Sequence, residues 1–119
     1  MFEVIEAGQD TAAMNGTHLQ GQIPYTYHEL ETILGPPTIV YEPGQKTDVE
    51  WVLRVNDATG SGEEVVATIY NFKNGINYLG PDRGTPLSEM MFFNVGGHDE
   101  RAIRLVNHIM VQLANLVHH

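Results

Sequence analysis

The segment TDVEWVLRV, residues 47–55, constrains the fold most, because its apolar and polar residues alternate. An extended chain places successive side chains on opposite faces. The apolar face carries Val49, Trp51, Leu53 and Val55. A period of two is typical of a half-buried strand. The chain must therefore build a sheet with one covered face, and we expect Trp51 to point into the core.

Two helices are predicted to supply that cover. Thr26 and Glu29 form a capping box at the start of the first helix, and the sequence Gly-Pro-Pro from residue 35 ends it, so this helix spans about 27–34. Apolar residues recur at helical spacing from about 99 to 116. We expect Gly96 and Gly97 to end a strand over 90–95, directly before this long C-terminal helix.

Other β-rich segments lie at 17–24, 38–41 and 65–72, and a hairpin is expected between the strands at 47–55 and 65–72. These elements predict an α+β domain: a small, mainly antiparallel sheet flanked by a short helix in the N-terminal half and a long C-terminal helix. We expect one domain over 1–119, with 1–14 as a loosely ordered or additional segment. A small sheet leaves edges to cover, so we expect a homodimer or larger homo-oligomer.

The composition excludes several classes of protein. Hydrophobic residues make up 42% of the 119 residues, which favours a globular protein, and the formal net charge of −9 disfavours general nucleic-acid or membrane binding. There is no cysteine and no long apolar run. We expect a soluble, cytoplasmic protein without a metal or cofactor, and assign no function to the terminal histidines, which are a tag remnant or native.

The stretch FFNVGGHDERAIRLV places Arg101 and Arg104 in the first turns of a helix, although the chain has only six Lys and Arg residues. Cations are unfavourable at the positive end of a helix, so the placement indicates an anion site. The alternative is a solvated surface on which Asp99 and Glu100 pair with the arginines, with Glu100 and Arg104 at i,i+4. The sequence leaves both interpretations open.

Further candidates for an anion site follow the strands. Arg54 lies near one strand end, and Phe72 and Lys73 lie at the end of the next. We expect these residues to meet Gly96, Gly97 and the two arginines at one end of the sheet. Arginine would hold phosphate and an aromatic ring would stack a base. The alternative for Phe72 is a place in the core.

The blocks GTHLQG, TYHELETILGPPT, EWVLRV, VATIYNFKNG and FFNVGGHDERAIRLV resemble, in this order, those of a family of small phage-encoded proteins, the first-described Thoeris anti-defence proteins. These viral sponges sequester cyclic ADP-ribose-type signals and, in some members, cyclic oligonucleotides. The resemblance implies that Phe72 stacks the base and that Arg101 and Arg104 hold phosphates. It also implies that the block HLQG, with Leu19 and Gln20, forms a pocket wall, while Gly96, Gly97 and His98 complete the site.

We therefore expect a phage anti-defence protein that binds a small cyclic nucleotide-type immune signal without turning it over, and not an enzyme. Two alternatives stay open. One is an acidic inhibitor that covers the nucleic-acid-binding surface of a host protein. The other is a hydrolase of a cyclic nucleotide, although the scattered histidines and the carboxylates of Glu63 and Glu64 do not identify a catalytic pair.

Overall fold

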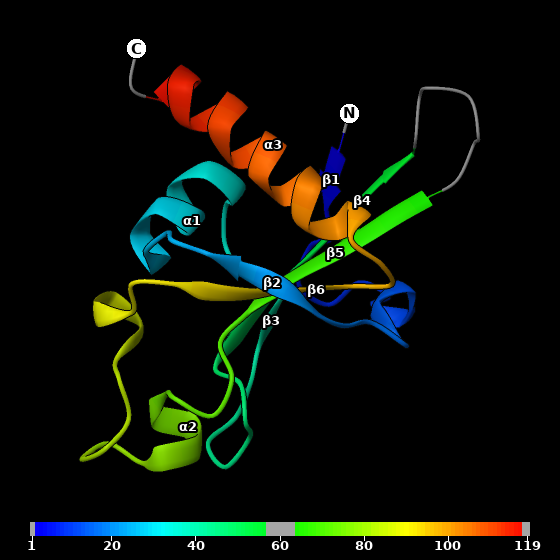
Figure 1. The fold of residues 1–119 in the computed structure, drawn as a ribbon. Coiled ribbons are helices and arrows are strands. Elements are labelled where there is room, and N and C mark those ends of the chain that lie inside the picture. Colours follow the sequence, from blue (N-terminus) through cyan, green and yellow to red (C-terminus); the bar gives the residue numbers. More distant parts are fainter. Residues whose placement is uncertain (1, 57–63, 118–119) are drawn as a thin grey trace.

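The computed structural model describes residues 2–117 except for 57–63, and it leaves the side chains of Asn56, Leu116 and Val117 undescribed. Its elements follow one another along the chain (Figure 1). The strands are β1 (Phe2–Val4), β2 (His18–Ile23), β3 (Ile39–Val40), β4 (Val49–Asn56), β5 (Glu64–Tyr70) and β6 (Phe93–Gly97). The helices are α1 (Tyr27–Leu34), α2 (Ile76–Leu79) and α3 (Arg101–Val117), with two 3-10 turns, η1 (Ala12–Met14) and η2 (Leu87–Glu89).

The strands form one antiparallel sheet in the order β1-β4-β5-β6-β2, and β3 pairs with β4 beyond the end of β1. This arrangement confirms the predicted α+β fold. The antiparallel pairing of β4 with β5 agrees with the expected hairpin, whose loop at 57–63 lies outside the described residues.

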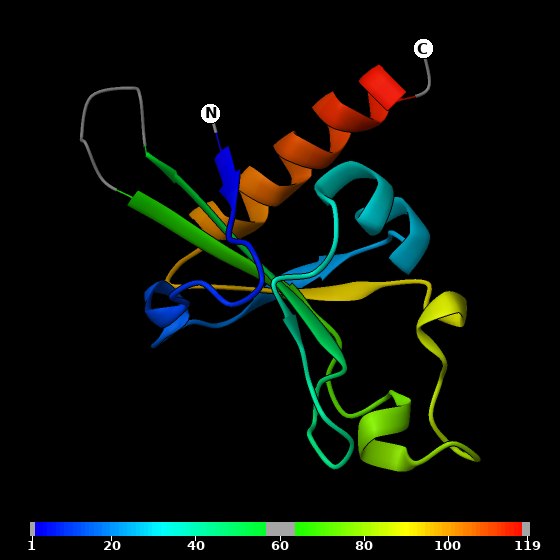
Figure 2. The same ribbon diagram turned by 180° about the vertical axis from the view of Figure 1, so that it is seen from behind.

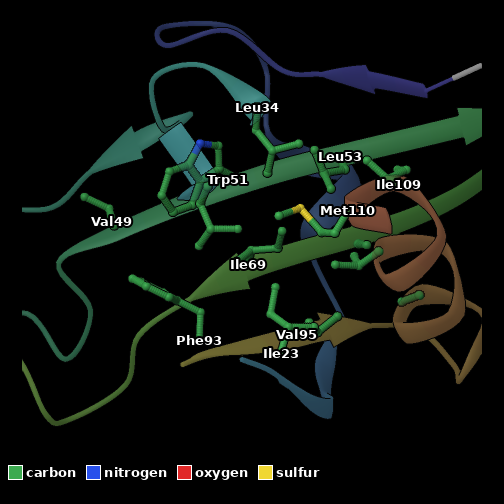
Figure 3. Packing of buried hydrophobic residues seen from close by; sticks show 14 of the residues in the cluster. Ile23, Leu34, Val49, Trp51, Leu53, Ile69, Phe93, Val95, Ile109 and Met110 are labelled. Carbon is green, nitrogen blue, oxygen red and sulfur yellow. The ribbon is translucent and has the colours of Figure 1, made fainter. Parts of the chain in front are cut away.

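Helices α1 and α3 cover the same face of the sheet, as the two opposite views show (Figure 1, Figure 2). The core between them contains Trp51, which is 0% exposed as predicted, and Phe93 meets its ring edge-on at 6.1 Å. Met110 of α3 packs into the same cluster (Figure 3). The Trp51 indole N–H donates to the Gly35 carbonyl at 2.9 Å, so the buried polar atom of this ring is satisfied.

The predicted limits of α1 are confirmed. The Thr26 hydroxyl accepts from the Glu29 N–H at 3.2 Å, and the Glu29 carboxylate accepts from the Thr26 N–H at 3.0 Å. Gly35 then ends the helix with φ of 84°, a left-handed conformation that favours glycine.

Two expectations need correction. Gly96 and Gly97 do not break the last strand but belong to β6, because both pair with residues of β2 and of β5. Helix α3 begins at Arg101 and not at 99, because Asp99 accepts from the Arg101 N–H. Residues 2–4, within the segment expected to be loosely ordered or additional, form β1.

The opposite face of the sheet has a smaller apolar cluster. Ile5, Val52 and Val66 are buried there, and η1 lies against them. A polar lobe, which we define as residues 41–48 and 71–85, extends from the end of the sheet that lies farthest from α3 (Figure 1, Figure 2). Hydrogen bonds of Asn71 and Asn77 hold it together: Asn71 donates to Asp48 at 2.8 Å, and Asn77 donates to the Tyr41 carbonyl at 3.0 Å.

Candidate functional site

Both arginines at the start of α3 are paired with carboxylates of neighbouring residues. The Arg101 guanidinium donates to both carboxylate oxygens of Asp99 at 2.8–3.1 Å, and this pair lowers the pKa of Asp99 to about 2. Arg104 lies 3.5 Å from the Glu100 carboxylate, as the solvated-surface interpretation predicts. A phosphate at this end of α3 would therefore compete with carboxylates that already contact both arginines.

Several residues of the sequence-predicted site do lie near this helix start. Leu19 pairs with Gly96 across the β2–β6 ladder, and the Gln20 side chain donates to the Gly97 carbonyl at 3.0 Å. A ring nitrogen of His98 lies 3.3 Å from the Ala13 carbonyl. These contacts pair protein groups with one another, so they describe a well-packed junction.

The expected convergence at one end of the sheet occurs only in part. Arg54 lies opposite Val66, and the next residue of β5 pairs with Gly97, so Arg54 is at the same end of the sheet as the start of α3. Arg54 is paired with Glu3 at 3.0 Å and lies 3.9 Å from Glu64. Phe72 follows the other end of β5, and at about 3.3 Å per residue it lies roughly 20 Å from this end. The antiparallel course of β4 and β5 places the C-terminal ends of these two strands at opposite ends of the sheet.

Phe72 and Lys73 belong to a different group of side chains, at the junction of the sheet and the polar lobe. Phe72 is 46% exposed and meets Tyr70 edge-on at 6.4 Å. The Lys73 ammonium lies 5.3 Å from the centre of the Phe72 ring and 5.9 Å from that of Tyr78, which is 45% exposed. Phe72 is thus not a core residue. Two accessible rings flank one cation.

Lys73 is unusual in its backbone conformation. Its φ of 59° is left-handed, the only such value among the described residues other than glycine. A side chain in this conformation costs about 1–2 kcal/mol. No carboxylate of the described chain forms a salt bridge with its ammonium, which is also true of Lys46 and Arg83, whereas the other three cations, Arg54, Arg101 and Arg104, are paired. Strain of this kind concentrates at functional sites.

The sheet continues this surface with polar side chains. Glu50, Tyr70 and Asn94 are successive partners across β4, β5 and β6, so they share one face. The Tyr41 hydroxyl donates to Glu50 Oε1 at 2.6 Å, and Gln22 donates to Asn94 Oδ1 at 3.1 Å. We call this surface the aromatic-polar face. Its residues are Gln22, Tyr41, Glu50, Thr68, Tyr70, Phe72, Lys73, Tyr78 and Asn94.

Glu50 and Tyr70 are half-buried on this face, and Thr68 is buried. Burial raises the pKa of Glu50, which the hydroxyls of Tyr41 and Thr68 lower only in part. Burial also raises the pKa of Tyr70, and the Glu50 charge adds to this effect. Thr68 is 1% exposed, and its hydroxyl makes no hydrogen bond of acceptable geometry with the described residues, although it lies close enough to influence Glu50. Buried polar groups are normally satisfied.

The sequence predicted only part of this surface. Phe72 and Lys73 are among the sequence-predicted site residues, whereas Glu50, Tyr41, Tyr70 and Tyr78 are not. The alternation of residues along the strands could have indicated Glu50 and Tyr70, since each lies on the polar face of its strand. The pairing that makes them neighbours is a tertiary feature.

Within the described ranges, no three His, Cys, Asp or Glu side chains gather as a metal site requires. Among the helices of the described chain, none has the length and apolar character needed to cross a membrane. Comparison of the chain with protein-family models, curated proteins and solved structures gave no match. The geometry of the two regions is therefore the main basis for assigning a function.

Proposed function

We propose that this protein binds a small anionic nucleotide-type ligand on the aromatic-polar face and holds it without turning it over. The resemblance noted in the sequence suggests the biological setting, namely a phage protein that sequesters a cyclic nucleotide-type immune signal. In this proposal Phe72 and Tyr78 stack a base, and Lys73 pairs with a phosphate.

One observation carries the proposal: the Lys73 ammonium lies 5.3 Å and 5.9 Å from the centres of two accessible aromatic rings, without a carboxylate partner in the described chain. Stacking on an aromatic side chain contributes about 1–3 kcal/mol per base. A charge-assisted hydrogen bond from lysine to phosphate adds about 1.5–3 kcal/mol. In a chain of net charge −9, an available cation is the feature that makes an anionic ligand tolerable at this position.

Capture fits this face better than catalysis. Its one carboxylate, Glu50, is held by the Tyr41 hydroxyl at 2.6 Å, and no histidine belongs to the face. Nucleophilic attack on a phosphodiester needs an activated nucleophile and a group that stabilises the developing charge. The raised pKa of Glu50 is nevertheless a property of general acids, so the hydrolase alternative needs a direct test.

Calorimetric titration with cyclic ADP-ribose, cyclic GMP and cyclic AMP tests the proposal. We expect at least one of them to bind, and Phe72→Ala to weaken that binding about tenfold to a hundredfold, because one stacking contact is lost. The affinity of Phe72→Leu should lie between those of the wild type and Phe72→Ala, since leucine keeps much of the apolar volume but has no aromatic ring. Equal binding by all three proteins, or no binding of any probe, would contradict the proposal.

Heat denaturation of the loaded protein followed by chromatography separates capture from turnover. We expect the bound probe to be recovered intact. Recovery of a linear nucleotide would instead establish the hydrolase alternative. No retention of the probe by the folded protein would remove both interpretations.

Self-association stays part of the proposal. Val40 on β3 is 73% exposed and Met91 before β6 is 71% exposed, and both are apolar. Exposed apolar side chains and uncovered strand edges favour association between copies. Light scattering at micromolar concentration should give at least twice the mass of the chain, and a monomer mass would remove this part.

A further inference from the structure

The proposed function leaves open which kind of base the aromatic-polar face accepts, and Glu50 bears on that question. This carboxylate lies opposite Tyr70 in the β4–β5 pairing, next to the rings that would stack a base. Its Oε1 accepts from the Tyr41 hydroxyl at 2.6 Å. An acceptor group that is fixed at one oxygen therefore lies beside Tyr70, whose ring meets Phe72.

We propose that Glu50 is the specificity-determining residue of this face and that it selects a base with adjacent N–H donors, as on the guanine edge, over adenine. The inference rests on the proposed function. A carboxylate only accepts hydrogen bonds, and guanine offers a ring N–H beside an exocyclic amino group. Adenine offers a ring acceptor at the corresponding position, which would face the carboxylate lone pairs.

The local chemistry supports a recognition role over a structural one. Burial raises the pKa of Glu50, and the hydroxyls of Tyr41 and Thr68 lower it only in part, so the ionised group is incompletely compensated. The Thr68 hydroxyl beside it is 1% exposed and has no hydrogen bond of acceptable geometry within the described chain. Gly96 lets the side chains of Thr68 and Tyr70 pack against the β6 backbone, because an added Cβ would lie 2.6 Å from Thr68 Oγ1 and 3.2 Å from the Tyr70 ring. Hydrogen-bond donors of a ligand would satisfy the acceptor oxygens of Glu50 and Thr68 that the fold leaves incompletely paired.

Tyr41 would act as a positioning residue. Its hydroxyl fixes one oxygen of Glu50, so that the other is directed to a ligand. In Tyr41→Phe the carboxylate remains but loses this restraint, and we expect the preference for guanine to fall about threefold to tenfold, since an intramolecular hydrogen bond contributes about 0.5–1.5 kcal/mol.

The test compares cyclic GMP with cyclic AMP by calorimetric titration of the wild-type protein, Glu50→Gln and the control Glu42→Gln. Glu42 is an exposed carboxylate beside Tyr41, so its variant makes the same charge change outside the face. We expect the wild type and the control to bind cyclic GMP about tenfold to a hundredfold more tightly than cyclic AMP. Glu50→Gln should lose most of that preference, because its amide replaces one acceptor with a donor.

The outcomes separate this inference from the proposed function. Equal binding of the two nucleotides by the wild type, or an unchanged preference in a folded Glu50→Gln, would overturn the role of Glu50 and leave capture by Phe72 and Lys73 standing. Binding of neither nucleotide would overturn the role of Glu50, and the absence of cyclic ADP-ribose binding as well would overturn both proposals. Thermal melts establish that each variant is folded, and we expect Glu50→Gln to melt no lower than the wild type.

Discussion

The two regions that could hold an anion differ in how completely the fold satisfies them. At the start of α3, Arg101 contacts both carboxylate oxygens of Asp99, and Arg104 has Glu100 as its partner. On the aromatic-polar face, Lys73 has no described carboxylate partner and a left-handed backbone. A cation that the protein has already neutralised stabilises the fold, whereas a strained cation without an ion pair is available to a ligand.

Gly97→Ala gives the largest expected effect and tests whether the helix start is a packed junction. The new methyl group would lie 2.2 Å from Ala102 Cβ and 3.3 Å from the Val66 carbonyl oxygen. Overpacking at a rigid contact costs about 1–3 kcal/mol, and we expect a value near the upper end. Chemical denaturation measures it. An unchanged midpoint would mean that α3 shifts easily and that this junction is looser than the structure indicates.

Asp99→Ala should lower stability by less than Gly97→Ala does, because it removes the acceptor for the Arg101 N–H at 2.9 Å. The pH dependence has a definite sign. The pKa of Asp99 is lowered to about 2, so its contribution is present above the ordinary carboxyl range and is lost as the pH falls from about 4 to about 2. Thermal melts over this range should show a steeper loss for wild type than for Asp99→Ala.

On the aromatic-polar face, Glu50→Gln should raise stability at neutral pH, whereas Asp99→Ala lowers it at the start of α3. Burial raises the pKa of Glu50, so the ionised carboxylate opposes folding at neutral pH, and stability falls as the pH rises from the ordinary glutamate range through the raised value. Tyr41 and Tyr70, the other titratable groups in contact, remain neutral there. We expect Glu50→Gln to melt slightly higher at pH 7 and to lack this part of the pH dependence. A lower melting temperature would show that the carboxylate is structurally compensated.

The difference between the two regions also explains what the sequence could predict. Trp51, the capping box at Thr26 and Glu29, and the Glu100–Arg104 pair depend on residues near one another in sequence, and all are confirmed. The aromatic-polar face depends on which residues lie opposite one another across strands and on the conformation of Lys73. Local patterns specify neither, and Phe72 and Lys73 were accordingly expected at the wrong end of the sheet.

The glycine pair shows the same limit at a single position. Gly96 and Gly97 were read as a break before the helix, because glycine commonly ends strands. In the structure each is required by a close approach from a different side, by Thr68 at Gly96 and by Ala102 at Gly97. The sequence shows that two glycines are present, but the reason for each lies in a tertiary contact, with β5 at Gly96 and with α3 at Gly97.

Lys73→Gly tests the central claim most directly, because it separates function from stability at one residue. Glycine adopts φ of 59° without strain, so we expect the melting temperature to stay the same or rise, by up to about 1 kcal/mol in stability. Binding of cyclic GMP should nevertheless weaken about tenfold to a hundredfold, since the charged hydrogen bond is lost. Arg104→Ala, with the same change in charge, should bind within about twofold of wild type, because the arginine is exposed and paired. Full-affinity binding by Lys73→Gly together with weakened binding by Arg104→Ala would contradict the account and return the site to the start of α3.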